Sequence, residues 1–211
     1  MFPNTFPSIE KFENSCENLG INNSSIIVVY DALGVFSSAR VWWMFKTFGH
    51  EKVYLLNGGL PDWINNKFPI EKLQKNIFKK GTFKAILKPD NIWNFTSITT
   101  NILEKKGLVV DARSKERFQG LVAETRTGLR SGNIPNSINI TYLDVLDNGK
   151  FKSKEKLKIV FSQIKSNQPL VFTCGSGITA CIILLASKLV LNNKKSIYDG
   201  SWTEFGTLFK E

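Results

Sequence analysis

The stretch LVFTCGSGITA, residues 170–180, has the pattern of a strand, a tight loop and the start of a helix. A short apolar run ends at Cys174, two glycines follow within three positions, and an uncharged apolar segment then continues up to Lys188. Glycines let backbone N–H groups turn inward in such a loop, and a helix start carries a partial positive charge. An anion is therefore favoured at Cys174. We expect a stabilised thiolate and a nucleophile here, although most free cysteines are small buried core residues.

Two classes of enzyme place a nucleophilic cysteine in a loop of this kind, namely phosphatases of the Cys-x5-Arg type and sulfurtransferases. The phosphatases need an arginine six positions after the cysteine, because its guanidinium clamps a dianionic phosphate. That position is Ala180 in this sequence. Phosphoryl chemistry is therefore disfavoured.

The cysteines and the histidine limit the other kinds of site. Cys16, Cys174 and Cys181 form no CxxC pair, and His50 is the only histidine in the 211 residues. We therefore expect no disulfide framework, no metal site and no histidine triad, with Cys16 and Cys181 in the core. No apolar run reaches the ~18 residues that span a bilayer. The first seven residues lack the features of a signal peptide, so a cytoplasmic protein without a membrane partner is expected.

The formal charge of +10 could indicate a nucleic-acid partner, but only five of the 28 basic residues are arginine. The lysines are spread along the chain, and the run from Lys150 to Lys158 contains no interleaved glycine-aromatic motif. We therefore expect solvated lysine faces and no nucleic-acid binding. The arginines are clustered, since four of them lie within residues 113–130: Arg113, Arg117, Arg126 and Arg130. Such a cluster suggests a planar, bidentate anion clamp, which lysine cannot replace.

The remaining chain alternates expected strands and helices, which is typical of the α/β class. The expected strands are 26–31, 53–56, 108–111, 138–140, 170–174 and 196–199, and the expected helices are 12–19, 39–48, 60–64, 98–103, 114–118, 153–164, 180–191 and 200–205. The β-branched run of the first strand indicates burial on both faces. Residues 67–91 are rich in lysine and have no sustained period, so this stretch is the candidate linker. We set the bounds of the linker at residues 76–92.

A weak internal repeat runs through these elements. A strand, a helix, a second strand and a glycine-containing turn before a tryptophan occur once around residues 26–63 and again around residues 170–202. Two α/β domains are implied, a non-catalytic one over residues 1–75 and a catalytic one over residues 93–211. In the first copy Asp31 takes the place of the cysteine, so only the second copy can carry a thiolate.

These residues resemble the tandem-domain sulfurtransferases of the rhodanese superfamily, and most closely its 3-mercaptopyruvate sulfurtransferase branch. The loop CGSGITA (residues 174–180) is similar to that branch's neutral active-site loop, and YDGSWTEF (residues 198–205) is similar to the family's C-terminal signature. The segments RVWWM (residues 40–44) and NGG (residues 57–59) resemble the first domain. VDAR (residues 110–113) and RFQG (residues 117–120) resemble the start of the second. The resemblance covers essentially the whole chain.

The resemblance implies two rhodanese-like domains, each a doubly wound, mostly parallel sheet flanked by helices. It also implies sulfur transfer from 3-mercaptopyruvate through a Cys174 persulfide to cyanide or a thiol, such as a small thiol or a thioredoxin-like protein. The resemblance further implies that no cofactor is required. Ser176 could relay a proton to the leaving enolate or could only line the loop. Thr179 is expected to cap the helix or to bond the loop. The implied substrate-binding residues are Arg117, Arg126, Gly175, Gly177, Ile178 and Thr179.

The sequence also departs from the family. The family's first domain begins about a strand, a helix and a turn earlier than Met1, so we expect this first domain to lack that start and to have an unpaired strand position. Asn133 and Asn136 stand where the family has His and Gly. Two alternatives stay open. One is a thiosulfate:cyanide sulfurtransferase, which is disfavoured because the loop has no cation to hold a sulfonate. The other is a non-catalytic or degraded sulfur-relay protein, which the missing start of the first domain favours.

Overall fold

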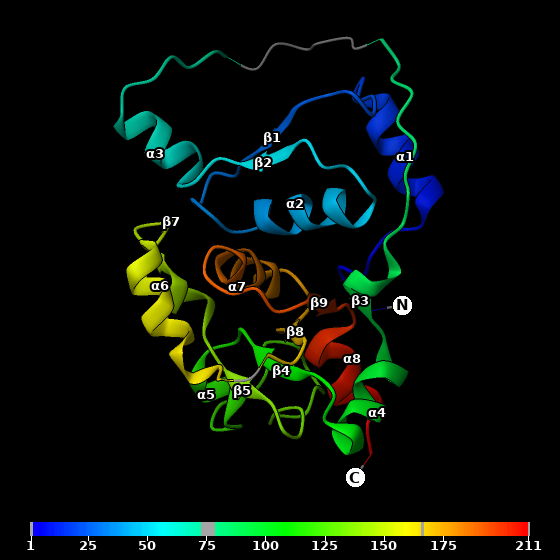
Figure 1. The fold of residues 1–211 in the computed structure, drawn as a ribbon, viewed down its shortest axis with the longest axis vertical. Coiled ribbons are helices and arrows are strands. Elements are labelled where there is room, and N and C mark those ends of the chain that lie inside the picture. Colours follow the sequence, from blue (N-terminus) through cyan, green and yellow to red (C-terminus); the bar gives the residue numbers. More distant parts are fainter. Residues whose placement is uncertain (1, 73–78, 166, 211) are drawn as a thin grey trace. The chain divides into compact units, whose positions relative to one another are not determined.

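The computed structural model describes residues 2–72, 79–165 and 167–210. Contacts divide the chain into two compact units (Figure 1). We call Phe6–Pro89 with Asn148–Lys150 the N-terminal unit, and Met1–Thr5, Asp90–Asp147 and Phe151–Glu211 the C-terminal unit. Both contain parallel strands joined by helices, which confirms the predicted α/β class.

The C-terminal unit is built on a five-stranded sheet in which every neighbouring pair is parallel. The strands in spatial order are β3 (Ile92–Trp93), β9 (Lys195–Tyr198), β8 (Leu170–Thr173), β4 (Leu108–Asp111) and β5 (Ile138–Asn139). All four residues of β8 are buried, as the continuous apolar run predicts for a central parallel strand. The residue that follows β8, Cys174, therefore lies at the carboxyl edge of the sheet.

Helices cover both faces of this sheet. Val109 and Val171 pack in one cluster with Ile98 of α4 (Phe95–Glu104) and Trp202 of α8 (Ser201–Leu208), while α7 (Thr179–Lys188) packs on β8 and β9 from the other face (Figure 1). The sheet is therefore doubly wound, as predicted. The unit also contains α5 (Lys115–Phe118), α6 (Lys154–Val160), and the 3-10 turns η2 (Tyr142–Val145) and η3 (Phe161–Gln163). The 3-10 turn η1 (Pro89–Asn91) begins at the last residue of the N-terminal unit's first segment. A small two-stranded sheet joins β6 (Leu146–Asp147) to β7 (Lys150–Phe151).

Local sequence explains where four helices start. Ser8, Asn94, Ser114 and Ser153 each accept a hydrogen bond from a backbone N–H three residues later. Such caps satisfy N–H groups that have no partner within the helix. These four polar residues set the first turns of α1 (Ile9–Asn18), α4, α5 and α6.

The N-terminal unit has a two-stranded parallel sheet, in which β1 (Ile27–Val29) pairs with β2 (Val53–Leu55). The helix α2 (Ser38–Thr47) joins them and packs on both, and α3 (Gly59–Asn65) follows β2. The prediction that the first strand is buried on both faces is wrong, because Val28 is 56% exposed and Ile26 and Tyr30 are exposed as well. Burial is therefore incomplete on this side of the strand, where Val28 and Tyr30 line a cavity together with residues of α3 and of the segment after it.

The segment predicted to be a linker is partly packed. Residues 79–89 belong to the N-terminal unit. There Gly81 N–H donates to Glu17 O at the end of α1, and Ile86 N–H donates to Phe48 O at the end of α2. Phe83 is fully buried against the Phe12 and Phe45 rings, which explains why this lysine-rich stretch holds its place. The predicted boundary between residues 75 and 76 lies outside the described residues.

The loop between β1 and α2 holds an anion of its own. Asp31 Oδ1 accepts the N–H of Leu33 at 2.9 Å, and Asp31 Oδ2 accepts those of Phe36 and Ser38 at 2.9 and 3.0 Å. Three backbone amides therefore turn toward one carboxylate. Asp31 is the residue that we predicted to take the place of the cysteine in the first copy of the repeat.

Replacing Asp31 with Ala should destabilise the protein, because three amides lose their charged acceptor. A hydrogen bond to a charged group contributes about 1.5–3 kcal/mol, so a loss of at least this size is expected. The measurement is urea unfolding followed by tryptophan fluorescence, with the exposed Asp90→Ala as the control. An unchanged midpoint for Asp31→Ala would show that the carboxylate does not support the loop.

Candidate active site

The predicted nucleophile lies where the connections of the C-terminal sheet diverge. Strand β4 continues to its neighbour β5 on one side, while β8 continues to β9 on the other. Crevices at such points, outside the carboxyl ends of the strands, are the usual ligand sites of open α/β sheets. Cys174 follows β8 at this point and is only 3% exposed.

The loop after Cys174 turns a backbone amide toward the sulfur. Gly177 N–H donates to Cys174 Sγ at 3.1 Å, and Gly177 has φ of 81°, a conformation that favours glycine. Ile178 is the N-cap of α7, and its carbonyl accepts the N–H of Cys181 at 3.1 Å. The helix therefore already begins at Thr179, so the prediction that Thr179 caps it is wrong. Cys181 is fully buried as expected, and its thiol donates to Gly177 O at 3.3 Å.

The start of α8 holds the other side of the loop. Trp202 N–H donates to Cys174 O at 2.9 Å, and Gly175 O accepts both the N–H (3.0 Å) and the hydroxyl (2.5 Å) of Thr203. Cys174 N–H in turn donates to Ser201 Oγ at 3.4 Å. Both peptide groups that flank the nucleophile are therefore bound by one helix start.

That helix start is itself anchored. Ser201 has φ of 52°, unusual for a residue other than glycine, and its hydroxyl donates to Tyr198 O at 3.0 Å. Burial raises the pKa of Tyr198 well above its usual range, so its phenol stays protonated and donates to Glu204 Oε2 at 2.8 Å. Trp202 is fully buried in the core cluster. The segment resembling the family's C-terminal signature thus positions the loop, a role that the sequence pattern did not reveal.

The two predicted substrate arginines converge on the same loop. A Cβ placed on Gly175 would lie 3.1 Å from Arg117 Nη2 and 3.9 Å from Arg126 Nη1. Both guanidinium groups therefore approach the residue after Cys174, and a side chain there would make a tight contact with Arg117. Arg117 Nε is buried and makes no hydrogen bond with the described residues, so a donor is left for an anionic ligand.

A buried ion network supports Arg117. Glu124 Oε2 accepts Arg117 Nη2 at 2.5 Å, and Glu124 Oε1 accepts Arg113 Nη1 at 2.7 Å. Arg113 also pairs with Asp111 at the end of β4 (Nη2 to Oδ2, 2.8 Å), and its guanidinium lies 4.4 Å from the centre of the Trp202 ring. Arg113 and Glu124 are almost wholly buried, so Arg113 lies within the structure that supports the site. Sequence reasoning missed Glu124. Its position between Arg117 and Arg126, the two predicted substrate arginines, was the signal available.

Ser176, the remaining predicted residue, is half-buried in the loop. Its hydroxyl oxygen accepts a hydrogen bond from Asn4 Nδ2 at 3.0 Å. Asn4 was not singled out from the sequence, because 172 positions separate the two residues and no motif connects them.

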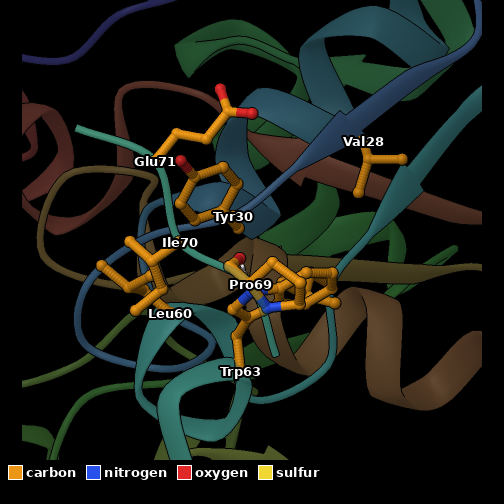
Figure 2. A pocket seen from close by; sticks show the side chains of 8 residues that line it. Val28, Tyr30, Leu60, Trp63, Pro69, Ile70 and Glu71 are labelled. Atoms are coloured by element: carbon orange, nitrogen blue, oxygen red, sulfur yellow. Dashed lines mark hydrogen bonds between the residues drawn. The ribbon is translucent and has the colours of Figure 1, made fainter. Parts of the chain in front are cut away.

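A separate cavity of about 500 Å³ lies in the N-terminal unit, where no site residue was predicted. Its lining is mostly apolar and comes from β1, the end of β2, α3 and the segment after α3: Val28, Tyr30, Leu56, Leu60, Trp63, Pro69, Ile70 and Glu71 (Figure 2). Trp63 Nε1 donates to Pro69 O at 2.9 Å and ties that segment back to α3. None of these lining residues is a cysteine.

Two further properties concern metals and membranes. Across residues 2–72, 79–165 and 167–210, no group of three or more His, Cys, Asp or Glu side chains is arranged to hold a metal ion. Within the same described residues, no helix has the length and apolar character needed to cross a membrane.

Replacing Glu124 with Ala should be strongly destabilising, because it leaves two guanidinium groups without their shared buried partner. Breaking a buried ion pair from one side costs about 3–5 kcal/mol. Urea unfolding of Glu124→Ala beside Glu116→Ala measures this, since Glu116 is an exposed glutamate of the neighbouring helix α5. Equal midpoints for the two variants would refute a supporting role for Glu124.

Comparison with known proteins places this site in a family. Residues 3–66 and 97–207 match the model of the rhodanese-like domain. The 3-mercaptopyruvate sulfurtransferase of Mus musculus is 39% identical over 97% of this chain and 70% of its own length. The mitochondrial thiosulfate/3-mercaptopyruvate sulfurtransferase 1 of Arabidopsis thaliana is 37% identical, and the match covers 97% of this chain but only 60% of that protein.

A solved structure agrees with these matches. The Tum1 protein from Saccharomyces cerevisiae superposes with a TM-score of 0.88 at 28% identity, covering 97% of this chain and 73% of that one. The predicted rhodanese-like folds are thereby confirmed. The domain model, the sequence identities and the superposition together show that this chain belongs to the rhodanese family.

Proposed function

We propose that this protein transfers the sulfur of 3-mercaptopyruvate, through a persulfide on Cys174, to a thiol or to cyanide, and releases pyruvate. The observation that carries this proposal is the convergence of Arg117 and Arg126 on Gly175, directly beside a cysteine sulfur that accepts the Gly177 amide. A sulfur nucleophile and two planar cations suit a small substrate that carries a carboxylate next to a reactive sulfur. The names of the relatives point to the same chemistry.

The first half of the reaction forms the persulfide. The Cys174 thiolate attacks the substrate sulfur, an S–S bond forms, and the C–S bond breaks with its electron pair passing to the enolate of pyruvate. A proton then adds to the enolate carbon. Arg117 and Arg126 would hold the carboxylate and the ketone oxygen, and the Gly177 amide would stabilise negative charge on the sulfur.

The second half regenerates the thiolate. An acceptor thiolate, or cyanide, attacks the outer sulfur of the persulfide, and the electron pair of the S–S bond returns to Cys174. The acceptor is proposed to be a small thiol or a thioredoxin-like protein, and the cytoplasmic location expected from the sequence is part of this proposal. No cofactor takes part in either half.

Replacing Cys174 with Ser should abolish pyruvate release from 3-mercaptopyruvate, because a hydroxyl is a far weaker nucleophile toward sulfur. The assay compares 3-mercaptopyruvate plus a thiol with thiosulfate plus cyanide. The control is Cys16→Ala, since burial raises the pKa of Cys16 to about 12 and leaves almost no thiolate at neutral pH. Preference for thiosulfate would replace the donor in this proposal, and inactivity of the folded wild type toward both donors would favour a non-catalytic protein.

Replacing Arg126 with Gln should raise KM for 3-mercaptopyruvate at least about tenfold, because a hydrogen bond to a charged group contributes about 1.5–3 kcal/mol. Steady-state kinetics of pyruvate release measure the effect. Lys115→Gln removes an exposed positive charge from α5 and is the matched control. Equal increases of KM in both variants would assign the effect to general electrostatics, and an unchanged KM in Arg126→Gln would remove Arg126 from the substrate site.

A further inference from the structure

The chain's first residues contribute to the surroundings of the active-site loop. Met1–Thr5 belong to the C-terminal unit, whereas the chain from Phe6 to Pro89 belongs to the N-terminal unit. Asn4 adopts a left-handed backbone conformation with φ of 61°, and Thr5 Oγ1 donates to Phe2 O at 3.3 Å. Asparagine is among the few residues that adopt this conformation readily. The resulting turn carries the Asn4 carboxamide whose nitrogen bonds Ser176.

The direction of this hydrogen bond determines what the serine can do. A hydroxyl has one proton to donate and can accept at its oxygen. Because Ser176 Oγ accepts the Asn4 N–H at 3.0 Å, the proton of Ser176 is left to donate to another group. Hydrogen bonds in a chain polarise one another, so an amide that donates to the hydroxyl makes that hydroxyl a better donor.

We propose that Asn4 is a positioning residue that holds the Ser176 hydroxyl as a proton donor to the enolate leaving 3-mercaptopyruvate. This inference rests on the proposed function and extends it to a residue outside the loop. When the C–S bond breaks, Ser176 passes its proton to the enolate carbon and receives the proton of the transferred S–H group. Overall, the proton of the substrate thiol ends on the methyl group of pyruvate, and Cys174 carries a persulfide anion.

The proposed role concerns only the step that makes pyruvate. The second transfer, from the persulfide to an acceptor, forms no enolate and needs no proton from Ser176. Asn4 should therefore affect the rate of pyruvate formation and leave substrate binding, which depends on the arginines, unchanged. It carries no titrating group, so the shape of the pH–rate profile should not depend on it.

The test uses Asn4→Asp, Ser176→Ala and the double variant in the full chain. Aspartate matches asparagine in shape but its carboxylate accepts, so it would draw the Ser176 proton toward itself. Asn66→Asp is the control, because Asn66 Nδ2 also donates one exposed hydrogen bond, to Asp62 O, but lies in the N-terminal unit. Loss of one net hydrogen bond of about 1 kcal/mol corresponds to about a fivefold fall in rate.

We expect Asn4→Asp to lower the kcat of pyruvate release about fivefold or more with KM unchanged. The double variant should be no slower than Ser176→Ala alone, since Asn4 acts through Ser176. Multiplied effects in the double variant, a change in KM alone, or an Asn4→Asp variant as fast as the wild type would overturn the role of Asn4. Absence of pyruvate release by the wild type would overturn the proposed function and this role together.

A measurement that does not depend on activity tests the contact itself. In the ¹⁵N-labelled full chain, the side-chain amide signals lost in Asn4→Asp identify Asn4, and those lost in Asn66→Asp identify Asn66. Ser176→Ala should shift the Asn4 signals and leave the Asn66 signals in place. Unmoved Asn4 signals would show that the hydrogen bond to Ser176 is absent, even if both variants reduce activity.

Discussion

The ion pair between Arg113 and Asp111 is the interaction on which the rest of the site depends. Arg113 is buried between the end of β4, Glu124 and the Trp202 ring, so one guanidinium joins the sheet, the arginine-bearing loop and the start of α8. Buried charges are tolerated only when they are fully paired, which restricts all of these partners to a single arrangement. Glu124 holds Arg117 in position through its carboxylate, and the start of α8 holds the peptide groups beside Cys174 through hydrogen bonds.

The two units contain loops of similar design with different anions. Between β1 and α2, three backbone amides bind the Asp31 carboxylate, and between β8 and α7 the Gly177 amide bonds the Cys174 sulfur. A loop that binds its own carboxylate has no place for a substrate anion. In the second loop the amide instead bonds a cysteine sulfur, the atom to which the proposed chemistry is assigned. The contrast explains why the chemistry is proposed for only one of the two units.

The N-terminal unit shows a different constraint. Its sheet has two described strands, and one face exposes Ile26, Val28 and Tyr30 together with Tyr54 of β2.

The chain spans 60% of the length of the Arabidopsis relative, so the activity of the whole relative comes to this chain only as a proposal. The buried aromatic cluster of Phe12, Phe45 and Phe83 nevertheless gives the N-terminal unit a core of its own.

The α/β class, the order of the elements, the glycine-rich loop after Cys174 and the arginine cluster could all be predicted from the sequence. These depend on local patterns: apolar runs, capping residues and glycines at short spacing. Three features became visible only in the folded chain: β1 has an exposed face, Phe83 packs residues 79–89 into the N-terminal unit, and Thr179 is not the cap. The tertiary structure alone brought Asn4 to Ser176, because 172 positions separate the two residues and no local pattern encodes such a contact. Glu124 lies only seven positions from Arg117, but the chain between them has no regular period from which their contact could be read.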